Sequence, residues 1–526
     1  MTTSNTDGFL LPHDVDALSL VRMLGGETCC AMDETTAFAL HFFDSFDWRL
    51  HQAGLRLLKI DTPQGGLLRL KPARGGDPIA AEPFDDRPAW PADLPAGELR
   101  DQVAKQLEMR VLLDLATVEW AATELHMLNE DGKTVVRIQY VQMACRSADV
   151  RESRALWPRV RLLPVRGYED ERDRLARHFA DELEWPAAPD CLFDEAMAAV
   201  GREAGDYSSK LDVPLKPKEH AVDAMRKILR TLMATLERNV DGTRADLDSE
   251  FLHDLRVATR RTRSALSQVK RVLPDAVVEE FKARFAWLGQ ITGPTRDLDV
   301  FLLELPHYRA SLPAAMAGDL DALEEQLKAA HKKEQAKLKR KLGSAEMRTL
   351  LSDWHNVLDA EHTPGEPGWF ADLPIEQVAS QRIWRMYKKV RKTGSTVTAD
   401  GPPEEMHELR KECKKLRYLI EFFRGLYPSS DVKLLIRALK DLLDNLGEFQ
   451  DLEVQADKLR DFARGFDPQA PSTLPTVMAI GALVADLLKR QQAAHARFAE
   501  CFAAFDTREN RQRYARLFKD KAHKTA

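Results

Sequence analysis

The chain has 526 residues, of which 44% are hydrophobic and 30% are charged, a composition typical of a globular protein with substantial buried cores. The length predicts two or three domains, and the formal net charge of −6 argues against a general nucleic-acid coat, which would be basic. Any anion binding must therefore come from a local basic patch on an acidic background.

Cysteine usage and apolar runs bear on the compartment. The six cysteines show no CxxC pair, which favours a reducing, cytoplasmic setting and disfavours a cysteine-based zinc site. The first residues, MTTSNTDGFLLPHD, lack the basic and apolar regions of a secretory signal. The longest apolar run, LPTVMAIGALVADLL at 474–488, is shorter than the roughly 18 residues of a membrane span and contains Asp486. We therefore expect a cytoplasmic protein without membrane contact.

The first 190 residues carry strand signals. Two short alternating runs, GLRLLKI at 54–60 and GGLLRLKP at 65–72, flank the turn-rich DTPQG and predict a pair of strands. Two longer runs, VEWAATELHML at 118–128 and KTVVRIQYVQM at 133–143, flank Asn-Glu-Asp-Gly and predict a hairpin. Residues 1–190 are therefore predicted to form a β-rich domain.

Helical patterns dominate the rest of the chain. A helical period begins at Tyr168, and the proline-containing segments WPAAPD and SSKLDVPLKPKEH then predict a linker over 191–214. After about residue 218 long amphipathic segments follow one another without strand signals. Residues 215–520 are therefore predicted to form an all-helical domain of bundles, with loops at 363–369 and 398–405.

This helical part contains an internal repeat. HDLRVATRRTRSAL at 253–266 returns as HELRKECKKLRYLI at 407–420, and TRDLDV at 295–300 returns as FQDLEV at 449–454, both 154 residues later. Two motifs that share one spacing indicate a duplicated helical unit.

The bounds of the two copies follow from this spacing. Repeat 1 is predicted over about 215–345 and repeat 2 over about 372–520. Gly289 and Gly447, which precede the second motif, stand 158 residues apart, which we interpret as four extra residues in the first copy, in the segment TGPT.

The first motif concentrates positive charge on one helix. At 100° per residue, His253, Arg256, Arg260 and Arg263 fall within about 80° of one another, beside an apolar face that contains Leu255. Like charges at (i, i+4) cost a few tenths of a kcal/mol each. The stripe is therefore destabilising unless an anion or neighbouring acids lie against it.

Two interpretations of the stripe remain open. Acids of neighbouring helices could neutralise it, and the candidates are Asp297, Asp299, Asp451 and Glu453. A linear chain of phosphates is the alternative that the repetition favours, because guanidinium groups bind oxygens bidentately and lysine acts as a movable point charge. Aromatic residues are sparse along the stripe, with Tyr418 in the second copy alone, which disfavours single-stranded nucleic acid.

The residues of the stripe form the predicted site. The predicted anion-binding residues are His253, Arg256, Arg260, Arg261, Arg263, His407, Arg410, Lys414, Lys415 and Arg417. Basic residues that could extend the stripe are Arg226, Arg230, Arg382, Arg385 and Lys389. Neither His253 nor His407 has a second His or Cys at ligand spacing, so no metal is predicted there. Catalytic triads, P-loops and dinucleotide fingerprints are absent from the sequence, and no catalytic residue or cofactor is predicted.

The two copies of the motif resemble the halves of the CHAD domain, the conserved-histidine α-helical domain. The resemblance rests on HDLRVATRRTRSAL with LGQITGPTRDLDVFL and on HELRKECKKLRYLIEFF with LGEFQDLEV. It implies two related four-helix bundles and a basic groove that binds inorganic polyphosphate, with association to polyphosphate granules. By position, the groove residues would be His253, Arg256, Arg260, Arg263, His407, Arg410, Lys414 and Arg417.

The N-terminal part resembles a CYTH domain, an antiparallel β-barrel or tunnel that binds or hydrolyses triphosphates with a metal ion. The resemblance rests on FALHFFDSFDWRLHQAGLRLLKI from Phe38 onwards and on LLPVRGYEDE at 162–171. The family's E-x-E-x-K strand would place Glu, Glu and Lys where Ser4, Thr6 and Gly8 stand, and hard cations need such clustered carboxylates. We therefore expect a degenerate domain without triphosphatase activity. The tunnel-type charges that remain are Arg56, Arg69, Lys71, Arg137 and Glu124.

These features favour one function over two others. The first is a non-enzymatic protein that binds polyphosphate through its helical domain. The alternatives are a metal-dependent inorganic triphosphatase that acts through the N-terminal domain and a helical scaffold for other polyanions, such as acidic proteins or nucleic acid.

Overall fold

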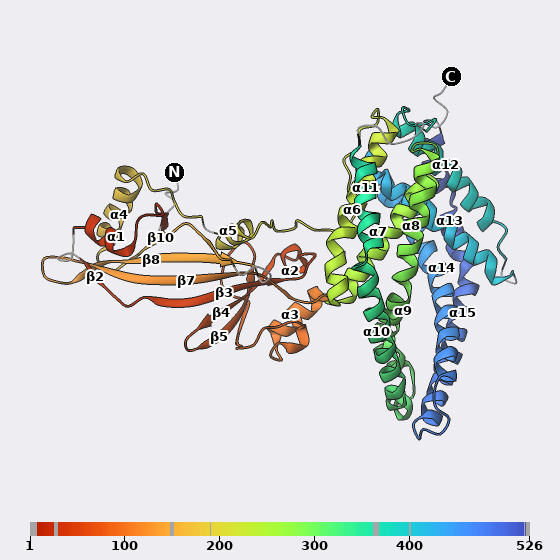
Figure 1. The fold of residues 1–526 in the computed structure, drawn as a ribbon, viewed down its shortest axis with the longest axis horizontal. Helices are drawn as coiled ribbons and strands as arrows, with labels where there is room; N and C mark the ends of the chain where they lie inside the picture. The colour runs from red at the N-terminus through yellow and green to blue at the C-terminus, as the bar shows by residue number, and fades with distance from the viewer. Residues whose placement is uncertain are drawn as a thin grey trace. The chain divides into compact units, whose positions relative to one another are not determined.

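The structure is a computed structural model that describes residues 8–25, 30–147, 152–189, 191–360, 368–398, 401–519 and 521. The chain divides into two compact units, Met1–Ser208 and Ser209–Ala526. The first is built on a β-sheet and the second from helices (Figure 1). The predicted order of a β-rich domain followed by an all-helical domain is confirmed.

The first unit is one antiparallel sheet. Its strands are β1 (Gly8–Leu10), β2 (Cys30–Met32), β3 (Thr36–Asp44), β4 (Leu55–Thr62), β5 (Gly65–Pro72), β6 (Ala80–Pro83), β7 (Leu113–Leu128), β8 (Thr134–Arg146), β9 (Arg154–Ala155) and β10 (Arg159–Leu163). Both predicted strand pairs are present, as β4 with β5 and β7 with β8. The order β1-β10-β8-β7-β3-β4-β5-β6 leaves β1 and β6 as ends, so the described strands form an open sheet rather than a closed barrel.

Short helices cover both faces of this sheet. They are α1 (Ala17–Met23), α2 (Arg49–Gln52), α3 (Glu98–Leu107), α4 (Glu169–Arg177) and α5 (Leu192–Ala199). Phe193, Ala196 and Met197 of α5 are buried in one core cluster with Trp48 and Leu58. Residues 191–208, which the sequence assigned to a linker, therefore belong to the first unit, because apolar side chains of α5 pack on the sheet.

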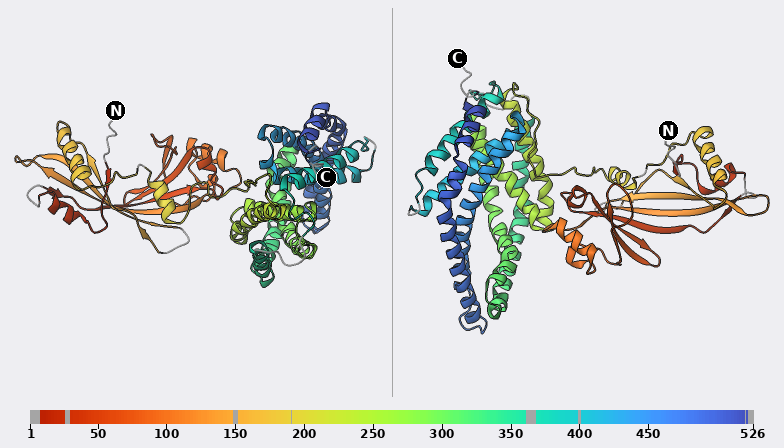
Figure 2. Two further views of the ribbon diagram at one scale, coloured as in Figure 1. Left: turned by 90° about the horizontal axis from the view of Figure 1, so that it is seen from above. Right: turned by 180° about the vertical axis from the view of Figure 1, so that it is seen from behind.

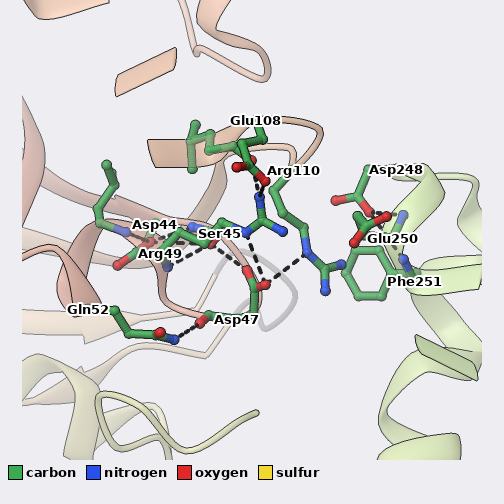
Figure 3. A network of polar contacts seen from close by, with 12 residues as sticks. Asp44, Ser45, Asp47, Arg49, Gln52, Glu108, Arg110, Asp248, Glu250 and Phe251 are labelled. Atoms are coloured by element: carbon green, nitrogen blue, oxygen red, sulfur yellow. Dashed lines mark hydrogen bonds and ion pairs between the residues drawn. The ribbon is translucent and has the colours of Figure 1, made fainter. Parts of the chain in front are cut away.

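A buried aspartate organises the turn after β3. The Asp44 carboxylate accepts the backbone N–H groups of Ser45, Leu50 and His51 at 2.7, 2.9 and 2.9 Å. Figure 3 shows Asp44 and Ser45 in this turn. It thereby satisfies donors at the start of α2 that have no partner within the helix. Trp48 adopts a left-handed φ of 63° in this turn, and its indole N–H donates to Asp206 at 2.8 Å.

The named secondary-structure elements of the second unit are all helices in its described residues. Its helices are α6 (Ala221–Ala245), α7 (Ser249–Gln268), α8 (Asp275–Ile291), α9 (Gly293–Ser311), α10 (Asp321–Leu342), α11 (Ala345–Asp359), α12 (Ile375–Gly394), α13 (Pro403–Phe422), α14 (Ser429–Arg464), α15 (Thr473–Phe505) and α16 (Arg508–Tyr514). Helix α13 starts inside the segment predicted as a loop at 398–405, since proline suits the first turn of a helix.

The helices follow the duplication. Helices α6, α7 and α8 begin at residues 221, 249 and 275, and α12, α13 and α14 begin at residues 375, 403 and 429, in each case 154 residues later. Helix α14 of the second copy is continuous, whereas the first copy divides the same length into α8 and α9. The break lies beside Pro294, which has no N–H to donate and is replaced by Glu448 in the second copy.

The positions of Gly293 and Gly447 contradict the inferred insertion of four residues in the first copy. A Cβ on Gly293 would lie 3.6 Å from Nη1 of Arg256, and one on Gly447 would lie 3.7 Å from Nη2 of Arg410. These glycines, like the two arginines, are 154 residues apart. Gly293 rather than Gly289 is therefore the counterpart of Gly447, and the inferred insertion is wrong.

The two copies share their cores. One apolar cluster combines α6, α7 and α8 with α12, α13 and α14, and a second lies between the hairpins α9–α10 and α14–α15. Figure 2 shows these two hairpins side by side in the helical unit. Because each cluster draws residues from both repeats, the helical unit folds as one body in which the two first-motif helices, α7 and α13, are neighbours.

Candidate anion-binding site

A pocket of about 520 Å³ lies between α7, α13 and α14 of the helical unit. Both copies of the charged motif contribute to it. Its lining residues are Ser209, Lys210, His253, Asp254, Val257, Arg260, Arg261, Arg410, Lys414, Arg417, Tyr418, Glu421, Leu443, Asp444, Gly447, Glu448 and Asp451. The duplication thus places cationic side chains that are far apart in the sequence around one cavity.

Two cations of this pocket, Arg260 and Lys414, have no carboxylate partner among the described residues. Arg260 is exposed, Lys414 is half-buried, and neither lies within 4.0 Å of a carboxylate oxygen in the described part of the chain. Burial, followed by the nearby charges of Arg410 and Arg260, lowers the pKa of Lys414 to about 8. Lys414, Arg410 and Arg260 therefore repel one another electrostatically. A bound anion would reduce this repulsion.

Other cations of the pocket are held by acids. Arg261 and Arg417 both bind Glu421, at 3.2 and 2.7 Å, and Arg410 binds Asp451 at 3.0 Å. Glu421 was not among the predicted acids, although its (i, i+4) spacing from Arg417 is visible in the sequence. The neutralisation of the stripe is therefore partial.

The four acids proposed as neutralising partners have different roles. Within the described residues, Asp451 is the one of the four that pairs with a predicted site residue, Arg410. Asp297 binds Lys458 at 2.5 Å, and Asp299 binds His331 at 2.7 Å. No ion pair of Glu453 occurs within the described ranges.

The α14 side of the pocket is acidic. Asp444, Glu448 and Asp451 all line it, and Glu448 binds Arg497 of α15 at 2.6 Å. The cavity therefore has a cationic side made by α7 and α13 and an acidic side made by α14. An elongated anion would lie along the α7 and α13 side.

His253 is oriented by the second motif. Nη2 of Arg296 lies 3.0 Å from Nδ1 of His253, and Nη1 of Arg296 donates to the carbonyl of Ser249 at 3.0 Å. Because arginine can only donate, Nδ1 accepts and the ring proton resides on Nε2. Gln450 replaces Arg296 in the second copy and binds Arg410 at 2.5 Å instead.

The remaining predicted residues lie outside the pocket lining. Nη1 of Arg256 donates to the carbonyl of Gly289 and to Oγ1 of Thr292, at 3.1 and 3.0 Å. These two hydrogen bonds stabilise the break between α8 and α9. Arg263 is exposed, and His407 and Lys415 are half-exposed. Lys210, which sequence reasoning missed, comes from the predicted linker, where no local signal marks it.

The possible extensions of the stripe separate into two groups. Arg226 pairs with Asp223 at 3.6 Å, Arg230 with Asp359 at 3.0 Å, and Lys389 with Glu412 at 2.9 Å. Arg382 and Arg385 make no ion pair within the described residues. The first group has internal partners, which gives those residues a structural role.

Lys389 provides a test of this distinction. Glu412 is only 2% exposed, its other oxygen has no hydrogen-bond partner in the described structure, and its carboxylate raises the pKa of Lys389. We expect Lys389→Met to lower the free energy of unfolding by about 1–3 kcal/mol, because a buried carboxylate loses its partner. The Lys389→Met variant should nevertheless leave anion affinity unchanged. Chemical denaturation and anion titration would measure the two effects.

The exposed neighbour Lys388 offers a matched control. It makes no ion pair in the described part of the chain, so Lys388→Met should leave stability within about 0.5 kcal/mol of the original. Equal stability of the two variants, or a selective loss of anion binding in Lys389→Met, would contradict the structural role.

The tunnel-type residues of the first unit lie in two sets separated by β3. Arg56 and Lys71 face each other across β4 and β5, with the Arg56 guanidinium 4.2 Å from the centre of the Phe193 ring. Glu124 lies 3.7 Å from Arg137 on β7 and β8. Arg69 is on β5 with Lys71.

The signature positions of the first unit supply no metal site among the described residues. Gly8 pairs with Arg161 in the sheet, while Ser4 and Thr6 lie outside the described residues. No group of three His, Cys, Asp or Glu residues suited to a metal occurs within the described ranges. None of the described helices combines the length and apolarity that crossing a bilayer requires.

Comparison with known protein families gives a match, which lies within the helical unit. The CHAD domain family model matches residues 227–460, a range that contains most of the pocket lining. No curated protein matches the chain.

Solved structures give three further comparisons. The CHAD domain of the plant Ricinus communis shares 24% identity over 56% of this chain and 96% of its own, with a TM-score of 0.46. PptA from Streptomyces chartreusis shares 19% identity over 54% of this chain and 99% of its own, with a TM-score of 0.42. A candidate adenylate cyclase from Bacillus halodurans shares 12% identity over 35% of this chain and 92% of its own, with a TM-score of 0.22.

Proposed function

Because residues 227–460 of this chain form a CHAD domain, we propose that the protein binds inorganic polyphosphate in the pocket between α7, α13 and α14. The observation that carries the proposal is the meeting of two repeated cationic helices at one cavity, where Arg260 and Lys414 have no carboxylate partner among the described residues. A chain of phosphates supplies regularly spaced negative charge without bases that require stacking. We further propose a cytoplasmic protein that associates with polyphosphate granules.

The binding should be largely electrostatic. Arginine and lysine side chains that contact phosphates release condensed counterions, so affinity should fall steeply as salt increases. His253 also lines the pocket, and its ring is oriented by Arg296. The acidic side made by α14 should limit how many phosphates enter the pocket at once.

Titration with long-chain polyphosphate tests this function directly. We expect tight binding at low salt and a linear decrease of the logarithm of the affinity with the logarithm of the salt concentration. Single-stranded DNA at matched charge should bind more weakly. Absence of polyphosphate binding at low salt, or a preference for DNA, would overturn the proposal.

The charge state of Lys414 should make binding depend on pH. Its pKa of about 8 in the free protein reflects burial and neighbouring cations, and a bound polyanion would favour the ammonium form. Affinity should therefore be highest below pH 8 and fall as the pH rises above it, with proton uptake on binding near pH 8. Calorimetry in buffers of different ionisation enthalpy measures that uptake.

The Lys414→Arg variant is the control for this pH dependence. Arginine stays protonated throughout this range, so the variant should bind with a flatter pH profile and less proton uptake. An unchanged pH profile in Lys414→Arg would assign the dependence to another group.

The alternative of a metal-dependent triphosphatase gains no support from the first unit. Arg56 with Lys71 and Glu124 with Arg137 lie on strands that β3 separates. Phosphate release from tripolyphosphate with Mg²⁺ or Mn²⁺ is the relevant assay. We expect none above background, and robust turnover would establish the enzymatic alternative.

A further inference from the structure

A second cationic cluster lies at the carboxyl end of α7. Lys270 and Arg271 follow this helix after its C-cap residue Val269, and Arg382 and Arg385 come from α12. The guanidinium groups of Arg271 and Arg382 lie 5.9 and 5.7 Å from the centre of the Phe370 ring. We call these four cations with Phe370 the Phe370 cluster.

Backbone contacts hold the Phe370 cluster in place. Nη2 of Arg382 donates to the carbonyl of Lys270 at 2.7 Å, and the N–H of Phe370 donates to the carbonyl of Arg271 at 2.7 Å. A Cβ on Gly368 would lie 2.5 Å from the carbonyl of Arg271, so this approach requires glycine. Hydrogen bonds to backbone carbonyls and a close backbone approach therefore fix the positions of Arg382 and Phe370 relative to residues 270 and 271.

The Phe370 cluster brings together four positive charges. None of its four cations lies within 4.0 Å of a carboxylate in the described part of the chain, in contrast to Arg230, Arg261 and Arg410 of the same unit. Nε of Arg382 is buried and has no hydrogen-bond partner among the described residues. Burial, with the neighbouring charges of Arg385 and Arg271, lowers the pKa of Arg382. Like charges are thus held together at an energetic cost that an anion would offset.

Helix α7 connects this cluster to the pocket. Arg260 lines the pocket, and exposed Arg263 follows one turn later. Gln268, the last residue of α7, lies about 12 Å from Arg260 along the helix axis at 1.5 Å per residue, and Lys270 follows two residues beyond it. Tripolyphosphate is too short to bridge such a distance, whereas a long chain of phosphates can.

We propose that the Phe370 cluster is a second phosphate subsite, which binds the part of a long polyphosphate chain that extends beyond the pocket. The inference rests on the proposed function and adds selectivity for chain length to it. A ligand that occupies both subsites gains affinity because the second contact is intramolecular. Short polyphosphates occupy the pocket alone.

The test compares two chain lengths on one pair of variants of the full chain. Arg271→Glu with Arg385→Glu reverses two exposed charges of the cluster and breaks no ion pair within the described residues. Calorimetric titration should show a loss of about tenfold or more in affinity for long-chain polyphosphate and less than a twofold change for tripolyphosphate. The salt dependence of long-chain binding should also become shallower, because fewer counterions are released.

A matched control removes the effect of net charge. Lys332→Glu with Lys333→Glu changes two exposed lysines of α10 and alters the net charge by the same amount. This control should leave long-chain affinity within about twofold of the original protein. An equal loss in both double variants would show a general charge effect and overturn the subsite.

The remaining outcomes separate the subsite from the proposed function. If the unmodified protein binds both polyphosphates and the cluster variant loses neither or both equally, the subsite is wrong and the proposed function stands. If the unmodified protein binds no polyphosphate, the proposed function itself fails. If the variant loses single-stranded DNA binding but keeps long-chain polyphosphate binding, the cluster is a nucleic-acid site and the inference is overturned.

Discussion

Replacing Arg260 and Lys414 together with glutamate is expected to lower polyphosphate affinity at least about 100-fold at low salt. Each side chain would contribute one charge-assisted hydrogen bond, worth about 1.5–3 kcal/mol, and 1.4 kcal/mol corresponds to a factor of ten. Glutamate would also place negative charge beside the acidic side made by Asp444 and Glu448. Titration at low and moderate salt measures the loss.

This double variant should remain folded. Neither side chain makes an ion pair within the described residues, and the charges that repel one another in the free protein are reduced when they are replaced. We expect an unchanged circular dichroism spectrum and an unfolding midpoint close to that of the original protein, because the repulsion between cations that is lost offsets the repulsion between carboxylates that is added. Retention of full affinity would place the binding surface elsewhere, even if the protein binds polyphosphate.

The Asp44→Ala variant is expected to lower the stability of the first unit by about 2–5 kcal/mol. Three backbone N–H groups of the turn after β3 would lose their common acceptor, and each buried donor without a partner costs about 1–3 kcal/mol before relaxation. Asp44 is only 4% exposed, so water replaces the carboxylate poorly. Denaturant unfolding followed by intrinsic fluorescence measures the change.

The location of this effect is as informative as its size. In a chain of two compact units, the transition of the first should shift while polyphosphate binding by the second stays constant. Asp44→Asn keeps one acceptor oxygen and should have an intermediate effect. Loss of polyphosphate binding in Asp44→Ala would show that the first unit supports the site, and this would contradict the assignment of binding to the helical unit.

The contrast between Arg256 and Arg410 shows how one motif position acquires two roles. Both arginines approach a glycine 37 residues further along the chain, Gly293 and Gly447. Pro294 breaks the helix in the first copy, and Arg256 donates to the carbonyl of Gly289 and the hydroxyl of Thr292 at the break. In the continuous α14, Arg410 binds Asp451 and lines the pocket. The helical stripe predicted equal roles for both, because it contains no information about partners on other helices.

Local patterns determined the elements and the duplication of this protein. Alternation at 54–60 and 65–72 specified β4 and β5, since side chains of a strand alternate between two faces. The motif spacing of 154 residues specified equivalent starts for α6 and α12, because each copy encodes its own helix ends. The concentration of positive charge on α7 and α13 is likewise a property of the sequence alone, since it follows from residue spacing along each helix.

Only the tertiary structure decided which of these charges share a cavity and which are neutralised. Lys389 and Lys414 both stand in segments rich in basic residues. Lys389 nevertheless pairs with buried Glu412. Lys414 lies beside Arg410 and Arg260 without a carboxylate partner in the described structure. The physical reason is that an ion pair depends on distances of a few ångströms between helices, and shared packing of the two repeats sets those distances. Periodicity along one helix specifies the direction of a side chain and leaves its partner undetermined.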